Sequence, residues 1–350
     1  MLNKNIYFGG ICMKKIFSLT FIIVLVLSFI VIPCRADDNI SQRYVDYRGI
    51  KIYTEVYNYH PNSKEAIVFL HGLGGSHSHG EFLYNKNNPY MTITLDYLDH
   101  GNSGHVPFIS WNTQLNSIKA VLDSYGIKKA HLVGHSFGAD TAMMFAKKYP
   151  ERVKDVVLLD RAYYNFKDFE KFNVTEDTMN ILEYESDSGL SYNEFLQYMD
   201  MAWDNDITKT WNINKDVLLL GGNCKNFLGD PSTGTPSLAG IISMIKEDPL
   251  KFGIDPDEAK LLPDITENDV LSLVDFLKKK INNFENVNRR FSVIQTNYAH
   301  GDMVRDPEAM SAMENYVIEY LQSQNKHIYK TKCGVDEKYK RSIYKYNFLH

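Results

Sequence analysis

The amino-acid sequence predicts an α/β protein, in which short buried strands alternate with helices. Short apolar runs at residues 66–70, 92–95 and 130–134 each lead into a turn that contains glycine. Such runs are typical of buried strands in parallel sheets. An amphipathic pattern over residues 307–321 predicts a helix. The chain has 350 residues, a length that suits one core with an insertion. Of these residues 44% are hydrophobic and 23% are charged, which is an ordinary globular composition.

The first of these strands, at residues 66–70, ends in a glycine-rich turn at 71–75. Glycine allows the backbone to pass close to a neighbouring loop. The amide of Leu73 in this turn is therefore a candidate donor to a negatively charged oxygen. The next strand, at 92–95, leads into the turn 96–104, which we interpret as structural because it is rich in Gly and Asn.

The third strand carries the most informative motif of the chain. Residues 130–134 run into Gly-His-Ser-Phe-Gly at 134–138 and then into a helical stretch at 139–146. A Gly-x-Ser-x-Gly match alone also fits an ordinary turn, but a strand before it and a helix after it predict a nucleophile elbow. Ser136 is then the nucleophile. The amides of Leu73 and Phe137 are the candidate oxyanion-hole donors.

A last strand is expected at residues 291–296, and His300 lies between it and the helix at 307–321. A single histidine is more often a surface or core residue than a catalytic one. Its place after the final strand, in the order serine, acid, histidine, favours His300 as the general base.

From about residue 44 to residue 321 the chain resembles the α/β-hydrolase superfamily. The elbow at 134–138, the turn at 96–104, the segment 149–160 and the loop 299–303 look like successive motifs of that family. The resemblance implies a doubly wound, mostly parallel sheet of the α/β-hydrolase type with a helical cap. Its core would comprise residues 44–160, the strand 216–222 and residues 291–322.

The acid of the triad departs from the commonest pattern of the family. Most members carry an aspartate just after the strand that corresponds to 216–222, where this chain has Asn, Cys and Lys at 223–225. Neither a neutral nor a cationic side chain can stabilise a protonated His300. Two acids remain open: Asp160, at a position that some branches of the family use, and Asp230. We favour Asp160, although it could also serve as an ordinary loop or capping residue.

Two insertions are expected to cover the site. In this family the segment 161–215 would form the cap, and here it is rich in Tyr, Phe, Trp and Met. Most of these side chains would form the cap's own core, and the remainder would line an apolar pocket. The segment 223–290, with a helical pattern at 267–278, would extend this lid.

The amino terminus predicts export. Residues 13–36 contain a basic start, an apolar stretch and a small-x-small ending, so residues 1–36 are interpreted as a cleaved signal peptide with Met13 as a possible true start. The protein would be secreted or held in the cell envelope. An uncleaved membrane anchor is the alternative, because the apolar residues 16–32 are at the short limit for a span. Pro33 argues against lipid modification of Cys34.

Charge and motifs exclude several partners and cofactors. Cleavage would remove four basic residues and no acidic one, changing the formal charge from −5 to −9, which argues against nucleic acid. His77 and His79 lack further metal ligands at suitable spacing, and no phosphate loop or dinucleotide fingerprint occurs, so no metal and no cofactor are expected. Cys224 and Cys333 could form one disulfide. The basic tail 323–350 lies beyond the expected fold. The sequence does not define an oligomeric state.

The function predicted from these features is that of an exported serine hydrolase of the carboxylesterase or lipase class (EC 3.1.1). Ser136, His300 and Asp160 would form the triad, and the substrate would be a small ester with an apolar acyl or aromatic group. The alternatives are an amidase or peptidase, an acyltransferase, a C–C bond hydrolase, and a relative that binds ligands without turnover.

Overall fold

A computed structural model describes residues 39–184, 188–230, 234–324 and 326. Eight strands form one sheet in the order β1-β2-β4-β3-β5-β6-β7-β8. β1 pairs antiparallel with β2, and β2 pairs antiparallel with β4, whereas every other pair is parallel. The predicted fold class is therefore confirmed. The strand bounds are β1 (Ile40–Tyr47), β2 (Ile50–Tyr57), β3 (Glu65–Leu70), β4 (Thr92–Leu95), β5 (Lys129–His135), β6 (Val153–Leu159), β7 (Asp216–Gly221) and β8 (Phe291–Gln295).

Helices cover both faces of this sheet. Alternate residues of a strand point to opposite faces, so Val68 packs with the cluster that includes α2 and α3, and Ile67 packs with the cluster that includes α10. The helices against the sheet are α2 (Trp111–Ser124), α3 (Phe137–Lys148), α9 (Glu267–Val287) and α10 (Pro307–Gln322). Short 3-10 helices occur at η1 (His77–Leu83), η2 (Pro150–Arg152) and η6 (Asp302–Val304).

The helix starts follow from local chemistry. The Ser110 side chain accepts from the Thr113 amide at the start of α2, and Thr266 and Asp269 form a capping box at the start of α9. Asp306 caps α10, which begins with Pro307, a residue that lacks an amide hydrogen where none is needed.

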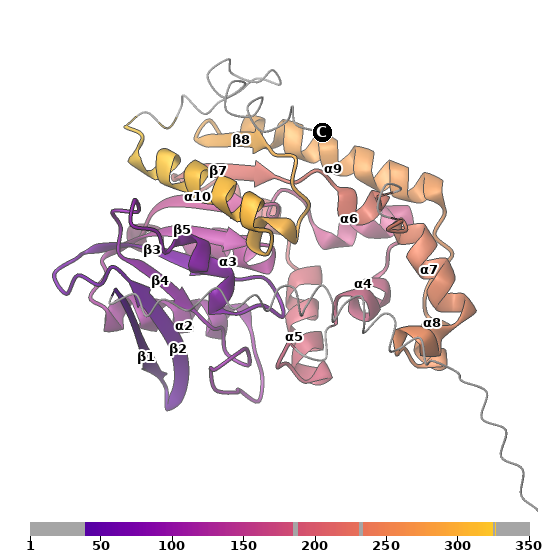
Figure 1. The fold of residues 1–350 in the computed structure, drawn as a ribbon, viewed down its shortest axis with the longest axis horizontal. Coiled ribbons are helices and arrows are strands. Elements are labelled where there is room, and N and C mark those ends of the chain that lie inside the picture. Colours follow the sequence, from indigo (N-terminus) through magenta and orange to yellow (C-terminus); the bar gives the residue numbers. More distant parts are fainter. Residues whose placement is uncertain (1–38, 185–187, 231–233, 325, 327–350) are drawn as a thin grey trace, which may run out of the picture.

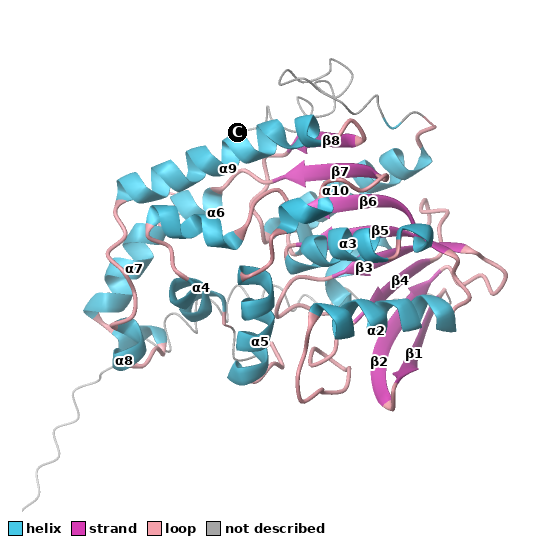
Figure 2. Cartoon of the chain, turned by 180° about the vertical axis from the view of Figure 1, so that it is seen from behind, coloured by secondary structure: helices cyan, strands magenta, loops and turns pink. Residues whose placement is uncertain are grey.

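The insertions lie beyond the carboxyl ends of the strands (Figure 1). The segment between β6 and β7 forms η3 (Phe166–Phe172), α4 (Glu176–Glu183), α5 (Tyr192–Trp203) and η4 (Ile207–Thr210). The segment between β7 and β8 forms α6 (Lys225–Leu228), α7 (Leu238–Glu247), η5 (Pro249–Phe252) and α8 (Pro256–Ala259), followed by α9. Both views place α7 and α8 on the same side of the sheet as α4, whereas α9 runs back along β8 (Figure 2).

In the described part of the chain, no helix has both the length and the apolar character needed to cross a bilayer. The predicted signal peptide at 1–36, with Met13 and Cys34, lies outside the described residues. So do Cys333, the proposed partner of Cys224, and nearly all of the tail.

Candidate active site

Ser136 lies on a sharp turn between β5 and α3. Its backbone has φ 53° and ψ −124°, a conformation that L-residues rarely adopt. A Cβ atom on Gly134 would lie 2.2 Å from the Gly138 carbonyl oxygen, and one on Gly138 would lie 1.9 Å from the Leu70 oxygen. Only glycine fits at these two positions, so the spacing of the motif follows from the close packing of the elbow.

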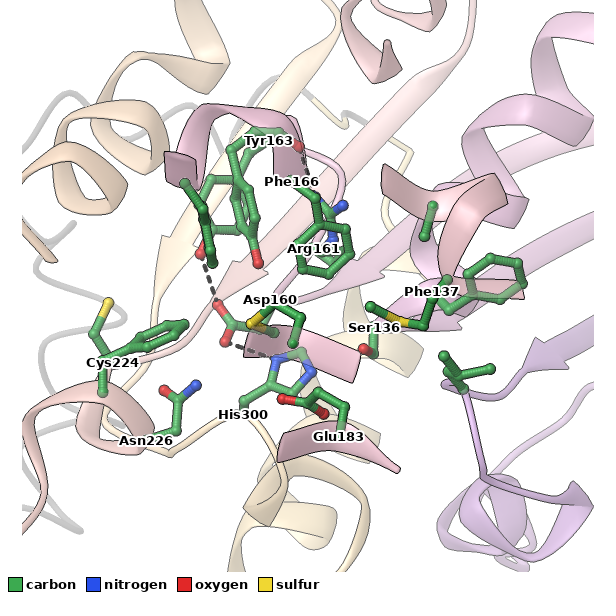
Figure 3. Close-up of a pocket in the computed structure, with 17 residues that line it drawn as sticks. Ser136, Phe137, Asp160, Arg161, Tyr163, Phe166, Glu183, Cys224, Asn226 and His300 are labelled. Atoms are coloured by element: carbon green, nitrogen blue, oxygen red, sulfur yellow. Dashed lines mark hydrogen bonds and ion pairs between the residues drawn. The ribbon is translucent and has the colours of Figure 1, made fainter. Parts of the chain in front are cut away.

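His300 and Asp160 meet beside this turn. His300 Nδ1 lies 3.1 Å from Asp160 Oδ2, and Asp160 is buried at the end of β6. Asp160 Oδ1 accepts from the Gly222 amide at 2.6 Å and from the Tyr163 hydroxyl at 3.2 Å. Figure 3 shows the His300 ring between the Asp160 carboxylate and Ser136. The arrangement fixes one nitrogen of the ring and leaves the other on the pocket side.

The second predicted acid lies elsewhere in the loop after β7. Asp230 Oδ2 is 3.5 Å from Lys225 Nζ, and the Asp230 backbone pairs with Thr235. Of the two acids that the sequence left open, Asp160 is the one in contact with His300.

Both predicted oxyanion donors are beside Ser136. Leu73 and Phe137 line the same pocket as Ser136 and His300. Phe137 is the first residue of α3, where an amide has no acceptor within the helix. Across the described ranges, neither the Leu73 amide nor the Phe137 amide donates to a protein acceptor. Two amides without a protein acceptor beside the nucleophile are available to bind an oxygen that gains negative charge.

Two buried histidines hold the loop that carries Leu73. His71 Nε2 accepts from the Tyr97 amide at 3.0 Å, and His100 Nε2 accepts from the Gly74 amide at 3.3 Å. Burial lowers the pKa of His71 well below its usual value and that of His100 to about 4. Both rings are neutral at neutral pH, as an accepting nitrogen requires. The turn 96–104, interpreted as structural, thus supports the loop through His100.

The pocket above Ser136 is small, and aromatic side chains form part of its lining. Its volume is about 60 Å³. Tyr164, Phe166 and Phe169 of the first insertion form one wall, and Phe227 of the second insertion packs edge-on against Phe169. Glu183 of α4 lines the same pocket as His300 (Figure 3).

Sequence reasoning missed a buried ion pair below this wall. Arg161 is 1% exposed, and its Nη2 lies 3.0 Å from Asp140 Oδ2 on α3. The guanidinium also lies 3.9 Å from the ring centre of Phe166 and 4.2 Å from that of Tyr164. Burial raises the pKa of Asp140 to about 6, against the opposing effect of Arg161. The residue types alone gave no signal, because the two partners are far apart in sequence.

The close pair His77 and His79, for which the sequence predicts no metal site, does not line the pocket of Ser136. His77 Nδ1 lies 2.8 Å from Asp96 and its Nε2 lies 3.5 Å from Glu55. Among the residues that the structure describes, Glu55, His77 and Glu81 bring three possible ligand atoms together, but none of them lines the pocket of Ser136.

Known proteins resemble this chain in the same region. Residues 65–183 match a family model described as alpha/beta hydrolase fold. A 110-residue segment is 39% identical to a 2-hydroxy-6-oxononadienedioate/2-hydroxy-6-oxononatrienedioate hydrolase of Paraburkholderia phymatum, covering 29% of this chain and 38% of that protein. A 112-residue segment is 30% identical to a probable alcohol acetyltransferase of Wickerhamomyces anomalus, covering 31% and 33%. The match therefore spans about a third of the length of these curated relatives.

A solved structure extends the likeness to most of the fold. The α/β hydrolase MGS-M2, from a Medee basin deep-sea metagenome library, aligns over 81% of this chain and 98% of its own, with a TM-score of 0.53 and 18% identity. The family match and the eight-stranded sheet together confirm the predicted resemblance: this chain is an α/β-hydrolase-fold protein.

Proposed function

We propose that the protein is a serine hydrolase that cleaves small carboxylic esters through an acyl-enzyme. The observation that carries the proposal is the contact of His300 Nδ1 with Asp160 Oδ2 beside a serine on a strained elbow. In the reaction, Ser136 Oγ attacks the ester carbonyl while His300 Nε2 takes the hydroxyl proton. The proton then passes to the leaving alcohol, and a water activated by His300 releases the acid.

Asp160 is suited to its part in this reaction. Because Gly222 and Tyr163 donate to Oδ1, the carboxylate is held with Oδ2 toward His300. An anion there fixes the ring tautomer and stabilises the imidazolium that forms during attack. The amides of Leu73 and Phe137 would bind the oxyanion of the tetrahedral intermediate.

The pocket supports a short acyl group. At the volume given above, the enclosed space suits a short acyl group better than a long chain. Its aromatic and methionine lining favours an apolar group over a sugar. One relative is named as an acetyltransferase, and another as a hydrolase of a different substrate class. Water as the acyl acceptor and an ester as the cleaved bond are therefore both part of what we propose.

The test is hydrolysis of p-nitrophenyl esters from acetate to palmitate. We expect an optimum at short chains. Ser136→Ala should lower kcat by roughly 10⁴-fold or more, and Asp160→Asn by roughly 10²- to 10⁴-fold. Asp230→Asn is the matched control and should retain wild-type activity, because Asp230 pairs with Lys225 outside the pocket.

Two results would contradict the proposal. One is the absence of ester hydrolysis together with failure of a fluorophosphonate probe to label Ser136, since an activated serine is labelled rapidly. The other is a loss of activity in Asp230→Asn that equals the loss in Asp160→Asn.

A further inference from the structure

The residue before the nucleophile contacts the histidine that faces it. His135 is the last residue of β5, and its Nε2 lies 2.9 Å from the main-chain carbonyl oxygen of His300. The two imidazole rings also pack together, with centres 4.7 Å apart and planes inclined by 37°. His135 does not line the pocket. It touches the proposed base without touching the space where a substrate would bind.

The partner of His135 defines its protonation state. A carbonyl oxygen only accepts hydrogen bonds, so Nε2 of His135 carries the proton and donates it. His135 Nδ1 is buried and lacks a hydrogen-bond partner within the described residues, which fits an unprotonated nitrogen. Burial, and next the neighbouring His300, lower the pKa of His135 well below its usual value. His135 is thus a neutral donor over the pH range in which a serine hydrolase works.

The contact links the loop that carries His300 to the end of β5, next to Ser136. His300 lies on the loop between β8 and η6, whereas Ser136 lies between β5 and α3. The same loop is also bonded to the segment that follows β7, where the Asn223 amide donates to the Tyr298 carbonyl oxygen at 3.0 Å. That bond is two residues before His300. The bond from His135 acts on the main chain of His300 itself and connects it to the residue adjoining Ser136.

We propose that His135 is a positioning residue that holds His300 in reach of both Ser136 and Asp160. The inference rests on the proposed function, because it assigns His135 a role for the base of that reaction. The hydrogen bond from His135 Nε2 fixes the His300 backbone, and the neutral His135 ring packs against the His300 ring. A small displacement of a base from its nucleophile is enough to lower the rate strongly.

Two substitutions separate the hydrogen bond from the ring. His135→Phe keeps an aromatic ring but cannot donate, and His135→Gln keeps an amide N–H that can reach the same carbonyl. We expect His135→Phe to lower kcat by roughly 10- to 100-fold with KM within about twofold of wild type. His135→Gln should recover most of that loss. His131→Gln is the matched control, since His131 is also buried on β5 but bonds Asp155 at the opposite end of the strand.

A second measurement does not need a substrate. The hydrogen that His300 shares with Asp160 should give a proton resonance far downfield in the NMR spectrum of the whole chain. We expect this resonance in the wild type, in His131→Gln and in His135→Gln, and its loss or broadening in His135→Phe. If the wild type cleaves no ester, the proposed function fails, whereas the resonance still reports whether His135 positions His300.

The inference is overturned if folded His135→Phe keeps the wild-type kcat and the wild-type resonance. It is also overturned if His135→Gln loses as much of either as His135→Phe does, because keeping an N–H donor at this position would then preserve nothing. Should His135→Phe fail to fold, the comparison of His135→Gln with His131→Gln decides: an intact resonance and rate in both support the inference, and a selective loss in His135→Gln rejects it.

Discussion

Asp160 is held in an uncommon backbone conformation by its neighbours. Its φ is 52°, in the left-handed region, and its Oδ1 accepts from the amide of Gly222 at the end of β7. The approach is so close that a Cβ on Gly222 would lie 2.4 Å from Asp160 Oδ2 and 2.7 Å from Cγ. Real Cβ atoms are not found at such distances from a carboxylate. Glycine is therefore needed at position 222 because Asp160 lies so close, and not because the backbone there adopts a positive φ.

We therefore predict that Gly222→Ala displaces the carboxylate and misorients His300. The expected result is a fall in kcat of roughly 10²-fold, comparable to misplacement of a catalytic group by about 1 Å. Steady-state hydrolysis of a short p-nitrophenyl ester measures it.

Gly301→Ala is the control for this substitution. Gly301 adjoins His300, has φ −73° and has open space where its Cβ would be, so its activity should stay near that of the wild type. Equal activity in Gly222→Ala and wild type would mean that Asp160 tolerates the intruding methyl group and that its geometry is not limiting.

The sequence predicts much of this geometry and favours Asp160 as the acid, but it leaves Asp230 open. Ser136 and His300 follow from local patterns, a strand with a glycine turn and a loop after the last strand. The acid depends on where the β6 and β7 ends meet in space. Asp160 and Asp230 are both aspartates in loops, and only the parallel pairing of Leu159 with Leu220 brings the first of them to His300.

At the scale of elements, a buried ion pair joins the elbow helix to the strand that carries the acid. Asp140 lies one turn into α3, and Arg161 directly follows Asp160. Both side chains are almost fully buried, and the Arg161 guanidinium also supports the aromatic wall of the pocket through Phe166. Removing one member leaves a buried charge without its partner, which costs far more than the pair itself contributes.

We predict that Asp140→Leu and Arg161→Met each lower the free energy of unfolding by about 3–5 kcal/mol. The double substitution should cost clearly less than the sum, because it leaves no unpaired charge. Urea denaturation of the four proteins completes the cycle. Additive losses would show that the two side chains do not interact across the helix and strand.

The elements that could be predicted are strands with a short apolar run and helices with a sustained apolar stripe. The strand predicted at 92–95 is found at Thr92–Leu95, and that at 291–296 at Phe291–Gln295. The helix predicted at 267–278 continues to Val287, because its apolar stripe persists. No strand was predicted at Ile40–Tyr47, where only two of the eight residues are buried, since an exposed edge strand lacks a continuous apolar run.

At the scale of the whole molecule, stability should depend on pH through the buried neutral histidines. Burial lowers the pKa of His79 and of His100 to about 4, and it lowers the pKa of His71 and of His135 well below the usual value. An unfolded chain binds protons on these groups below about pH 6.5, whereas the folded chain does not. Their contribution is therefore complete above pH 6.5 and is lost as the pH falls toward 4. Buried Asp99 and Asp140, with pKa values raised to about 6, act in the opposite sense.

We predict that His100→Gln isolates one part of this effect. Glutamine can donate to Leu98 and accept from Gly74 but does not titrate. Between pH 7.5 and pH 5, the wild type should lose about 2 kcal/mol more of its unfolding free energy than the variant does. Urea denaturation at both pH values measures the difference, and parallel losses would mean that His100 is protonated in the folded protein.

The described insertion helices do not form a core of their own. Phe169, Phe195 and Trp203 belong to the same continuous hydrophobic cluster as Val68 and Leu132 of the sheet. The side chains that would contact a substrate therefore belong to the same hydrophobic core that stabilises the fold. A core substitution that adds or removes one methyl group can then change the shape of the pocket without contacting it, because a close-packed interior transmits the strain. It also means that selection on substrate choice and selection on foldability act on the same residues.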